Sequence, residues 1–378
     1  MYRRDVGAFQ HEKWKQRVFV KEFMMRFRSI RRDGATLLFT VCVLAVTAMA
    51  QTRTFSVSTI GNHNDEVLGV FVNAANTRFA TCGVDETIKI WSLPDGKELR
   101  TLSGHLGTVN NLSFSGNDKA LASASTDQTV RIWDVESGRQ LAVLRGHTAE
   151  VSSVYYSQAD TGAFIASSGF DRTVKLWDTR VSCADAAKCP PTEVMTLRGH
   201  TDVVNGVAYS YDGRYIASCG DDMKIIVWSV SDMFQGKASS FTLESGAHTA
   251  PVLTCLFSFD SQRLISSDKN GVVNIWNLSS RTLERSIKAH DELVQDVTLA
   301  EDNTTLITVG LDKVVRMWNI TTGEKLYEHQ LDTEIWGVDV TSDAKRIVLA
   351  CSDGTVRMLK EVESKPADRK ADKPAKKK

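Results

Sequence analysis

The chain has 378 residues, with 46 Lys and Arg against 46 Asp and Glu, so its net charge is zero and its length suits one all-β domain. The charge is unevenly distributed: residues 1–33 carry +6, residues 360–378 carry +4, and the segment between them carries −10. Phosphate contacts require clustered Lys and Arg, so an acidic body argues against a nucleic-acid-binding surface there and leaves the two basic ends for weak contacts of that kind.

The N-terminal extension, residues 1–52, contains an uncharged apolar segment at 34–50 that follows ten basic residues. Three interpretations remain open. The segment is a signal peptide with Ala48-Met49-Ala50 as its cleavage site, or a membrane anchor that is short for the ~20 residues of a span. Alternatively, translation starts at Met49 and the preceding residues are not part of the mature chain.

Residues 53–362 contain a repeat with a period of 41–53 residues. Each of the first six units has a His, a hydroxyl residue, an acidic or amide residue and a Trp at corresponding positions. These sets are His63, Thr81, Asp85 and Trp91; His105, Ser123, Asp127 and Trp133; His147, Ser167, Asp171 and Trp177; His200, Ser218, Asp222 and Trp228; His248, Ser266, Asn270 and Trp276; and His290, Thr308, Asp312 and Trp318. A seventh unit keeps Asp353 but has Leu331, Leu349 and Leu359 at the other three positions.

The dipeptides Gly104-His105, Gly146-His147, Trp133-Asp134 and Trp177-Asp178 resemble those of WD repeats, the G-protein-β-like family. In that family each repeat forms four antiparallel strands, which make one blade of a propeller. The resemblance implies an all-β, seven-bladed β-propeller. It also implies a buried hydrogen-bonded chain from Asp through His and Ser or Thr to Trp, so these residues are interpreted as structural tetrads rather than as catalytic groups.

The strand count predicts how the ring closes. Seven first strands are expected, near Val67, Val109, Val151, Val204, Val252, Val294 and Ile335. The last unit supplies only three strands, and the segment 54–60 is left over at the front of the repeat region. We therefore expect this N-terminal strand to complete the seventh blade and to remove an exposed edge. Two insertions, 181–191 and 231–240, are expected in loops on the bottom rim.

The sequence argues against an enzyme and against a metal site. It contains no nucleophile elbow, P-loop or HExxH motif, and the large side chains expected to reach the channel are mainly apolar. The seven Cys residues form no CxxC pair, which excludes the usual zinc pattern, although Cys183 and Cys189 share a loop and could pair. No cofactor and no small-molecule substrate are therefore expected.

Partner proteins are expected to bind the top face of the propeller, around the channel. Most positions predicted to reach this face are small or polar, but five are large and apolar: Leu68, Phe170, Leu253, Leu311 and Trp336. Blades 5, 6, 7 and 1 contribute four of them, which would form an apolar arc. Trp is strongly enriched at binding hot spots, so Trp336 is the leading candidate. The alternative is that Trp336 caps the atypical seventh blade.

The tetrapeptide Trp177-Asp178-Thr179-Arg180 is similar to the box by which substrate receptors dock on the adaptor of cullin-type ubiquitin ligases. In those receptors the Arg contacts the adaptor, and Arg180 would do so here. A general scaffold for assembling a multiprotein complex is therefore the first hypothesis, and a ubiquitin-ligase receptor is the alternative.

The C-terminal tail, residues 363–378, is rich in Lys and is expected to be disordered, with at most weak contacts to nucleic acid or other acidic partners. The scattered Cys residues suit a reducing compartment, and the family that the chain resembles is mostly cytosolic or nuclear. Both observations predict a cytoplasmic protein, or a nuclear one. Anchoring in a membrane through residues 34–50 is the alternative location.

Overall fold

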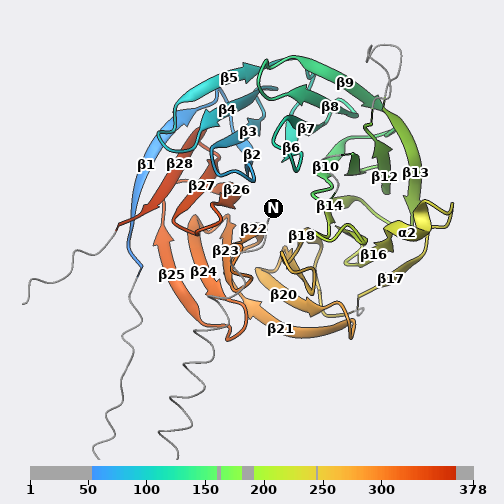
Figure 1. Ribbon diagram of the computed structural model, residues 1–378. Helices are drawn as coiled ribbons and strands as arrows, with labels where there is room; N and C mark the ends of the chain where they lie inside the picture. The colour runs from blue at the N-terminus through green and yellow to red at the C-terminus, as the bar shows by residue number, and fades with distance from the viewer. Residues whose placement is uncertain (1–52, 160–162, 181–190, 244–245, 363–378) are drawn as a thin grey trace, which may run out of the picture. The chain divides into compact units, whose positions relative to one another are not determined.

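Seven four-stranded antiparallel sheets surround a central channel in the computed structural model, which describes residues 53–159, 163–180, 191–243 and 246–362 (Figure 1). Blades 1 to 3 comprise β2 (Val67–Val72), β3 (Arg78–Gly83), β4 (Ile88–Ser92) and β5 (Glu98–Leu102); β6 (Val109–Phe114), β7 (Ala120–Ser125), β8 (Thr129–Asp134) and β9 (Gln140–Arg145); and β10 (Val151–Tyr156), β11 (Phe164–Gly169), β12 (Thr173–Asp178) and β13 (Thr192–Arg198). Blades 4 to 6 comprise β14 (Val204–Tyr209), β15 (Tyr215–Gly220), β16 (Ile225–Ser229) and β17 (Ser240–Thr242); β18 (Val252–Phe257), β19 (Arg263–Asp268), β20 (Val272–Asn277) and β21 (Thr282–Lys288); and β22 (Val294–Leu299), β23 (Thr305–Gly310), β24 (Val314–Asn319) and β25 (Lys325–Gln330). Blade 7 comprises β26 (Ile335–Val340), β27 (Arg346–Cys351), β28 (Thr355–Glu361) and β1 (Phe55–Asn62).

The first strand of each unit lies innermost, beside the first strands of the neighbouring blades (Figure 1). Apolar side chains pack between adjacent sheets, so each core cluster draws on two blades. Between blades 1 and 2, for example, Ile90 packs with Leu112 and Trp133. Because every blade is buried on both faces by its neighbours, second strands such as β11 are buried along their whole length.

The N-terminal strand closes the ring as predicted. β1 pairs antiparallel with β28, from Phe55 opposite Glu361 to Asn62 opposite Thr355, and forms the outer edge of blade 7. Arg53 strengthens this contact, since its Nε lies 2.7 Å from Oε1 of Glu361. The first and last described segments of the chain are therefore held in one sheet, and blade 7 gains its fourth strand.

The propeller has two faces that are made from different loops. The top face consists of the loops before each first strand and between the second and third strands. The amide of Val84 joins two such loops by donating to Glu66 O at 2.9 Å. The bottom face consists of the loops between the first and second and between the third and fourth strands, where Leu93 N donates to Thr77 O at 2.9 Å.

The second insertion forms α2 (Val230–Met233), a single turn that lies between the third and fourth strands of blade 4 and so belongs to the bottom face. Residues 181–190 of the first insertion lie outside the described residues, as do Cys183, Cys189, the segment 34–50 and the tail 363–378. Within the described ranges, no helix has the length and apolar character that a membrane span requires. Cys82, Cys219, Cys255 and Cys351 are buried and form no disulfide with one another.

Candidate functional site

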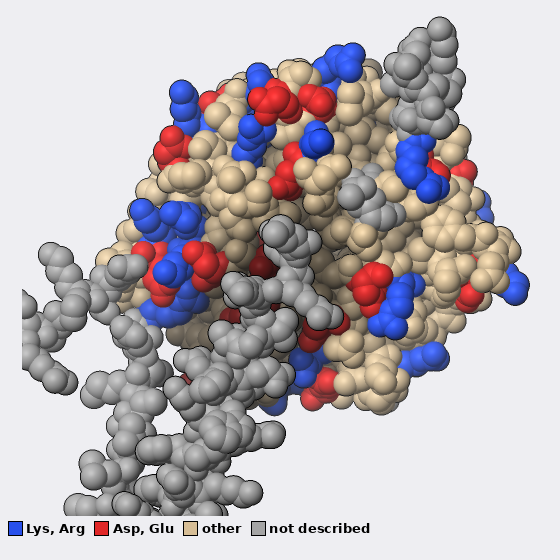
Figure 2. All heavy atoms as spheres, in the orientation of Figure 1, with Lys and Arg blue, Asp and Glu red and all other residues tan. Residues whose placement is uncertain are grey.

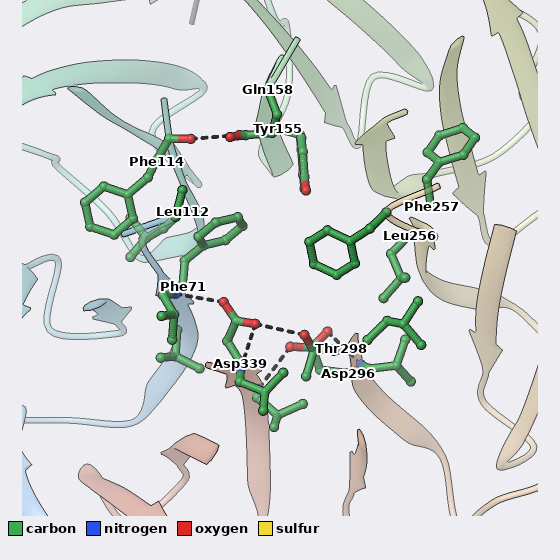
Figure 3. Close-up of a pocket in the computed structure, with 18 of the residues that line it drawn as sticks. Phe71, Leu112, Phe114, Tyr155, Gln158, Leu256, Phe257, Asp296, Thr298 and Asp339 are labelled. Carbon is green, nitrogen blue, oxygen red and sulfur yellow. Dashed lines mark hydrogen bonds between the residues drawn. The ribbon is translucent and has the colours of Figure 1, made fainter. Parts of the chain in front are cut away.

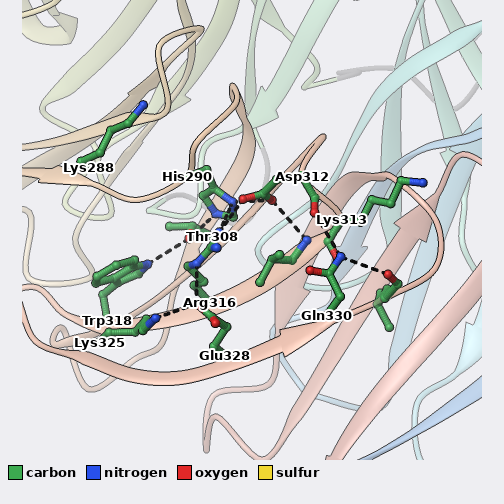
Figure 4. Close-up of polar contacts among 12 residues, drawn as sticks. Lys288, His290, Thr308, Asp312, Lys313, Arg316, Trp318, Lys325, Glu328 and Gln330 are labelled. Atoms are coloured by element: carbon green, nitrogen blue, oxygen red, sulfur yellow. Dashed lines mark hydrogen bonds and ion pairs between the residues drawn. The ribbon is translucent and has the colours of Figure 1, made fainter.

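Six blades contain a hydrogen-bonded chain of four side chains, which Figure 4 shows for blade 6. There, His290 Nδ1 lies 2.8 Å from Asp312, His290 Nε2 lies 2.8 Å from Thr308 Oγ1, and Trp318 Nε1 donates to the same hydroxyl oxygen at 3.0 Å. In blades 1 to 5 the His–hydroxyl distances are 2.7–2.9 Å and the Trp–hydroxyl distances 2.8–3.0 Å. Arg316 covers the blade 6 chain, with its guanidinium 2.6 Å from Asp312.

The protonation states follow from burial and hydrogen bonding. Burial lowers the pKa of His63 and His105, so both rings are neutral at pH 7. A neutral ring donates from Nδ1 to the carboxylate and accepts from the hydroxyl at Nε2, while the hydroxyl oxygen accepts from Trp. Burial alone would raise the pKa of Asp127, but hydrogen bonds from Thr129 and His105 lower it to about 2. These chains are complete internally, which suits a structural role.

The prediction that Asn270 supplies the acidic position of blade 5 is wrong. His248 Nδ1 instead lies 2.7 Å from Oδ2 of Asp268, two residues earlier. The backbone N–H of Asn270 donates to the other oxygen of Asp268 at 2.9 Å, and the Asn270 side-chain amide donates to Thr249 Oγ1 at 3.2 Å. An asparagine cannot carry the negative charge that completes the chain. Asp268 can reach the same space because residues 268 and 270 flank one tight turn. Blades 1 to 4 and 6 have Gly or Ser at the earlier position.

Blade 7 replaces the chain with apolar packing. Leu331, Leu349 and Leu359 lie in the core cluster between blades 6 and 7. Asp353 then pairs with Arg357 at 2.6 Å. Trp336 is not a member of that core cluster. The side chains of the three Leu residues therefore occupy the space of the missing tetrad, and the ring of Trp336 does not.

Polar side chains on the innermost strands join neighbouring blades near the top face. Nδ2 of Asn110 donates to Val151 O at 2.9 Å, and Nδ2 of Asn205 donates to Val252 O at 2.9 Å. Ser152 bonds the carbonyl of Val204 in the same way. At the equivalent positions, blades 5, 7 and 1 have Leu253, Trp336 and Leu68. The two Leu side chains have no polar group, and the indole Nε1 of Trp336 forms no such bond among the described residues.

Leu68, Leu253, Leu311 and Trp336, here called the apolar arc, are all partly exposed near the top of the channel. They come from four successive blades of the closed ring, 5, 6, 7 and 1. The indole Nε1 of Trp336 is buried and has no hydrogen-bond partner among the described residues. A buried N–H without an acceptor is costly, so Trp336 occupies a position that the packing of this chain alone does not favour.

The top face also exposes three large apolar side chains on the opposite side of the ring. Phe170, which was predicted to reach this face, is 44% exposed, and Leu106 and Met223 are 82% and 46% exposed. Sequence reasoning missed Leu106 and Met223. Leu106 directly follows a tetrad His, where other blades have Asn, Thr or Asp, and this contrast was the available signal.

Arg180 lies at the bottom end of blade 3, two residues after the end of β12. Its guanidinium contacts Asp178 at 2.6 Å and lies 4.6 Å above the ring of Phe164, while the side chain remains 62% exposed. The guanidinium that the docking box requires is therefore accessible to solvent, and it also contacts Asp178 and Phe164 of the same blade.

The expectation of a mainly apolar channel fails at the bottom end. Asp296 of β22 and Asp339 of β26 line a cavity there, together with Phe71 and Tyr155 (Figure 3). Sequence reasoning missed these residues, although the strand register could have located them, since alternate residues of each innermost strand face the channel. No cluster of potential metal ligands occurs among the described side chains.

The fold and the tetrads together define a class, the seven-bladed propeller built from tetrad-bearing repeats. A model of the family "WD domain, G-beta repeat" matches residues 54–92, 96–134, 138–178, 191–229, 239–277, 281–319 and 322–359. The chain therefore belongs to the WD-repeat family. Propellers of this family generally bind other proteins and are generally non-catalytic.

Several curated proteins are similar to this chain at low identity. Nuclear distribution protein PAC1-2 of Uncinocarpus reesii is 27% identical over 293 residues, which cover 70% of this chain and 61% of that protein. Nuclear distribution protein nudF of Aspergillus niger is 26% identical, with 77% and 68% covered. Protein hir1 of Schizosaccharomyces pombe is 24% identical, with 42% and 19% covered. The chain thus spans less than two thirds of the length of PAC1-2 and a small part of hir1.

Proposed function

We propose that this protein is a non-catalytic scaffold that assembles a multiprotein complex by binding a partner protein at the apolar arc. The observation that carries the proposal is the arc itself. Where blades 2, 3 and 4 use Asn or Ser to bond the next blade, the arc presents Leu68, Leu253 and Trp336 near the solvent. Partly exposed aromatic and aliphatic side chains around a recess are the usual core of a protein-binding hot spot.

The indole N–H of Trp336 supports the same site. Trp is favoured at interfaces because it combines a large apolar area with one hydrogen-bond donor. Nε1 is buried in this structure, so a partner that covers the exposed part of the ring would satisfy this donor only by shifting the indole toward its own backbone carbonyl. Phe170, Leu106 and Met223 would then extend the contact across the top face.

The test is affinity purification of the tagged full chain from its own cells, with mass spectrometry of the eluate. Trp336→Ala is expected to reduce recovery of the main partner by at least tenfold, which corresponds to about 1.4 kcal/mol. Phe234→Ala is the matched control, because Phe234 is an exposed aromatic residue (52%) next to α2 on the bottom face. Undiminished recovery of every partner with Trp336→Ala would refute the apolar arc as the docking site.

A ubiquitin-ligase substrate receptor is the second candidate, favoured by the exposed guanidinium of Arg180. A cullin and its adaptor in the eluate, lost with Arg180→Ala but retained with Trp336→Ala, would establish that role. An eluate without them would leave the scaffold role.

The same experiment reports the N-terminal peptide of the bait, which bears on the location we propose, the cytoplasm or nucleus. A peptide from residues 1–33 would instead favour anchoring through residues 34–50.

A further inference from the structure

A cavity of about 420 Å³ lies at the bottom end of the central channel, at the end opposite the apolar arc. Its wall is divided chemically. Blades 1, 3, 4 and 5 contribute the aromatic side chains Phe71, Tyr155, Tyr211 and Phe259. Blades 6 and 7 contribute the carboxylates Asp296, Glu301 and Asp339. Figure 2 shows acidic side chains deep in the central hollow, where the view is not covered.

The aromatic half is a connected group. Phe71 and Tyr155 meet edge to face with their ring centroids 6.0 Å apart, and Tyr211 stacks on Phe259 at 4.4 Å. Tyr155 and Tyr211 are neighbours on this wall. Figure 3 shows Phe71 and Tyr155 on the wall of the same space into which Asp339 and Asp296 project.

The two aspartates of the acidic half accept hydrogen bonds from uncharged donors. Asp339 accepts from Val72 N at 2.7 Å and from Thr298 Oγ1 at 2.8 Å, and Asp296 accepts from Val338 N at 3.0 Å. Neither carboxylate forms an ion pair with a Lys or Arg in the part of the chain that the structure describes. Burial raises the pKa of Asp296 to about 7 and that of Asp339 to about 6, and the charge of Asp339 adds to the effect on Asp296.

Blade 2 shows that the structural task does not need a charge. Asn111, at the position of Asp296, accepts from Val154 N at 3.2 Å, and Ser113, at the position of Asp339, accepts from Tyr156 N at 3.0 Å. Both bonds join neighbouring innermost strands, as the two aspartates do. Asn and Ser therefore suffice for joining blades, and the negative charge of Asp296 and Asp339 is left without a counter-charge from the described chain.

We propose that this cavity binds the side chain of a lysine that a partner protein presents, with its ammonium group between Asp296 and Asp339 and its methylene chain against Phe71 and Tyr155. Aromatic faces attract a cation within about 6 Å of the ring centroid, and carboxylates bind it through charge-assisted hydrogen bonds. Lysine is favoured over arginine because each oxygen of Asp296 and Asp339 already accepts at least one hydrogen bond, which leaves fewer directions for further donors. A guanidinium fork needs an in-plane lone pair on both oxygens of one carboxylate, whereas an ammonium group acts as a point charge with no such requirement.

The titratable groups that face the cavity set the expected pH dependence. They are Asp296, Glu301, Asp339, Tyr155, Tyr211 and Cys255. At pH 8 the carboxyl groups of Asp296 and Asp339 are ionised, and the raised pKa of Tyr155, about 12, keeps its hydroxyl neutral. At pH 5 both aspartates are mainly protonated, so binding of a cation is expected to weaken.

The experiment uses the full chain and Nα-acetyl-lysine N-methylamide as the probe, with binding followed by ligand-observed NMR. We expect a Kd of about 1 mM or tighter at pH 8, a loss of at least tenfold at pH 5, and no binding of the Nε-acetylated probe. The double variant Asp296→Asn/Asp339→Asn keeps one acceptor oxygen at each position, for the bonds from Val338 N and Val72 N, and is expected to lose binding by at least tenfold. Asp291→Asn, an exposed acid outside the cavity, is the control and is expected to bind normally.

Two results would overturn the proposal. One is the absence of binding at 10 mM probe, and the other is equal binding by the neutral probe or by the double variant. A third variant, with Lys365, Lys370, Lys373, Lys376, Lys377 and Lys378 changed to Gln, tests the source of the lysine. Probe binding that is tenfold tighter in this variant than in the natural chain would mean that the tail occupies the cavity and would overturn the assignment to a partner.

Discussion

At the scale of single residues, the hydroxyl group is the centre of each tetrad. In blade 2, Ser123 Oγ lies 2.7 Å from His105 Nε2 and accepts from Trp133 Nε1 at 2.9 Å. All three groups are buried, so neither nitrogen has access to water as a replacement partner. The tetrad therefore concentrates the polar content of the blade core in one shared oxygen atom.

Ser123→Ala is expected to lower the free energy of unfolding by about 2–3 kcal/mol, because two buried polar groups lose their partner at once. Urea unfolding followed by Trp fluorescence measures this change. Ser103→Ala, at an exposed serine of the same repeat, is the control and is expected to change stability by less than ~0.5 kcal/mol. Equal effects of the two substitutions would show that the tetrad of blade 2 does not stabilise the fold.

The acidic position of blade 5 provides a second test at this scale. Asp268→Asn removes the charge beside His248 and is expected to cost about 1.5–3 kcal/mol, as for other buried hydrogen bonds to a charged group. Asn270→Ala removes an exposed amide and is expected to cost less than ~0.5 kcal/mol. The same urea titration compares them. The reverse order would restore the repeat-based assignment of Asn270.

At the scale of secondary-structure elements, β1 stands out because it comes from the opposite end of the repeat region. Without it, β28 would present its unpaired backbone groups at the outer edge of blade 7. Phe55 and Val57 would also be lost from the core cluster between blades 6 and 7, against which they pack. The ring thus depends on one strand for both edge pairing and apolar contact.

A chain that starts at His63 is expected to melt at least 10 °C below the natural chain and to form oligomers, because it exposes β28. A chain that starts at Arg53 is the matched control and is expected to keep its melting temperature, since it retains β1 and the ion pair of Arg53 with Glu361. Differential scanning calorimetry and size-exclusion chromatography provide the two readouts. Similar melting of both truncated chains would mean that β1 is dispensable for closure.

The sequence predicted the elements well because their signals repeat. Four columns of residues at a regular period located the blades, and the missing fourth strand of the last unit predicted the role of β1. The same regularity caused the error in blade 5, since Asn270 has the standard spacing from Trp276 and Asp268 does not. The bottom cavity went unnoticed for a related reason. Its residues occupy equivalent positions in different blades, and their aromatic and acidic halves become visible only when the ring is closed.

At the scale of the whole molecule, the two ends of the channel have different chemistry. The top end has the apolar arc, and the bottom end has two carboxylates without a counter-charge. The propeller also contains buried groups whose pKa values are lowered and others whose pKa values are raised, and the two kinds change the free energy of unfolding with pH in opposite directions. The neutral His63 and His105 stabilise the fold above their unfolded pKa of about 6.5, and this contribution is lost as the pH falls below that value. Asp127 and Asp312, with pKa values of about 2, lose their contribution between about pH 4 and pH 2.

Asp296 and Asp339 have the opposite sign, because burial raises their pKa values to about 7 and about 6, above the unfolded value. The folded state then binds more protons than the unfolded state between about pH 4 and pH 7, so these two residues lower stability as the pH rises through that window. In Asp296→Asn/Asp339→Asn this loss disappears. Each pKa unit corresponds to about 1.4 kcal/mol, so the stability of the variant relative to the natural chain is expected to increase by about 2 kcal/mol or more between pH 5 and pH 8. Urea titrations at the two pH values measure the difference. A difference that does not change with pH would mean that the two charges are already compensated within the chain, and the bottom cavity would then have no excess negative charge to offer a lysine.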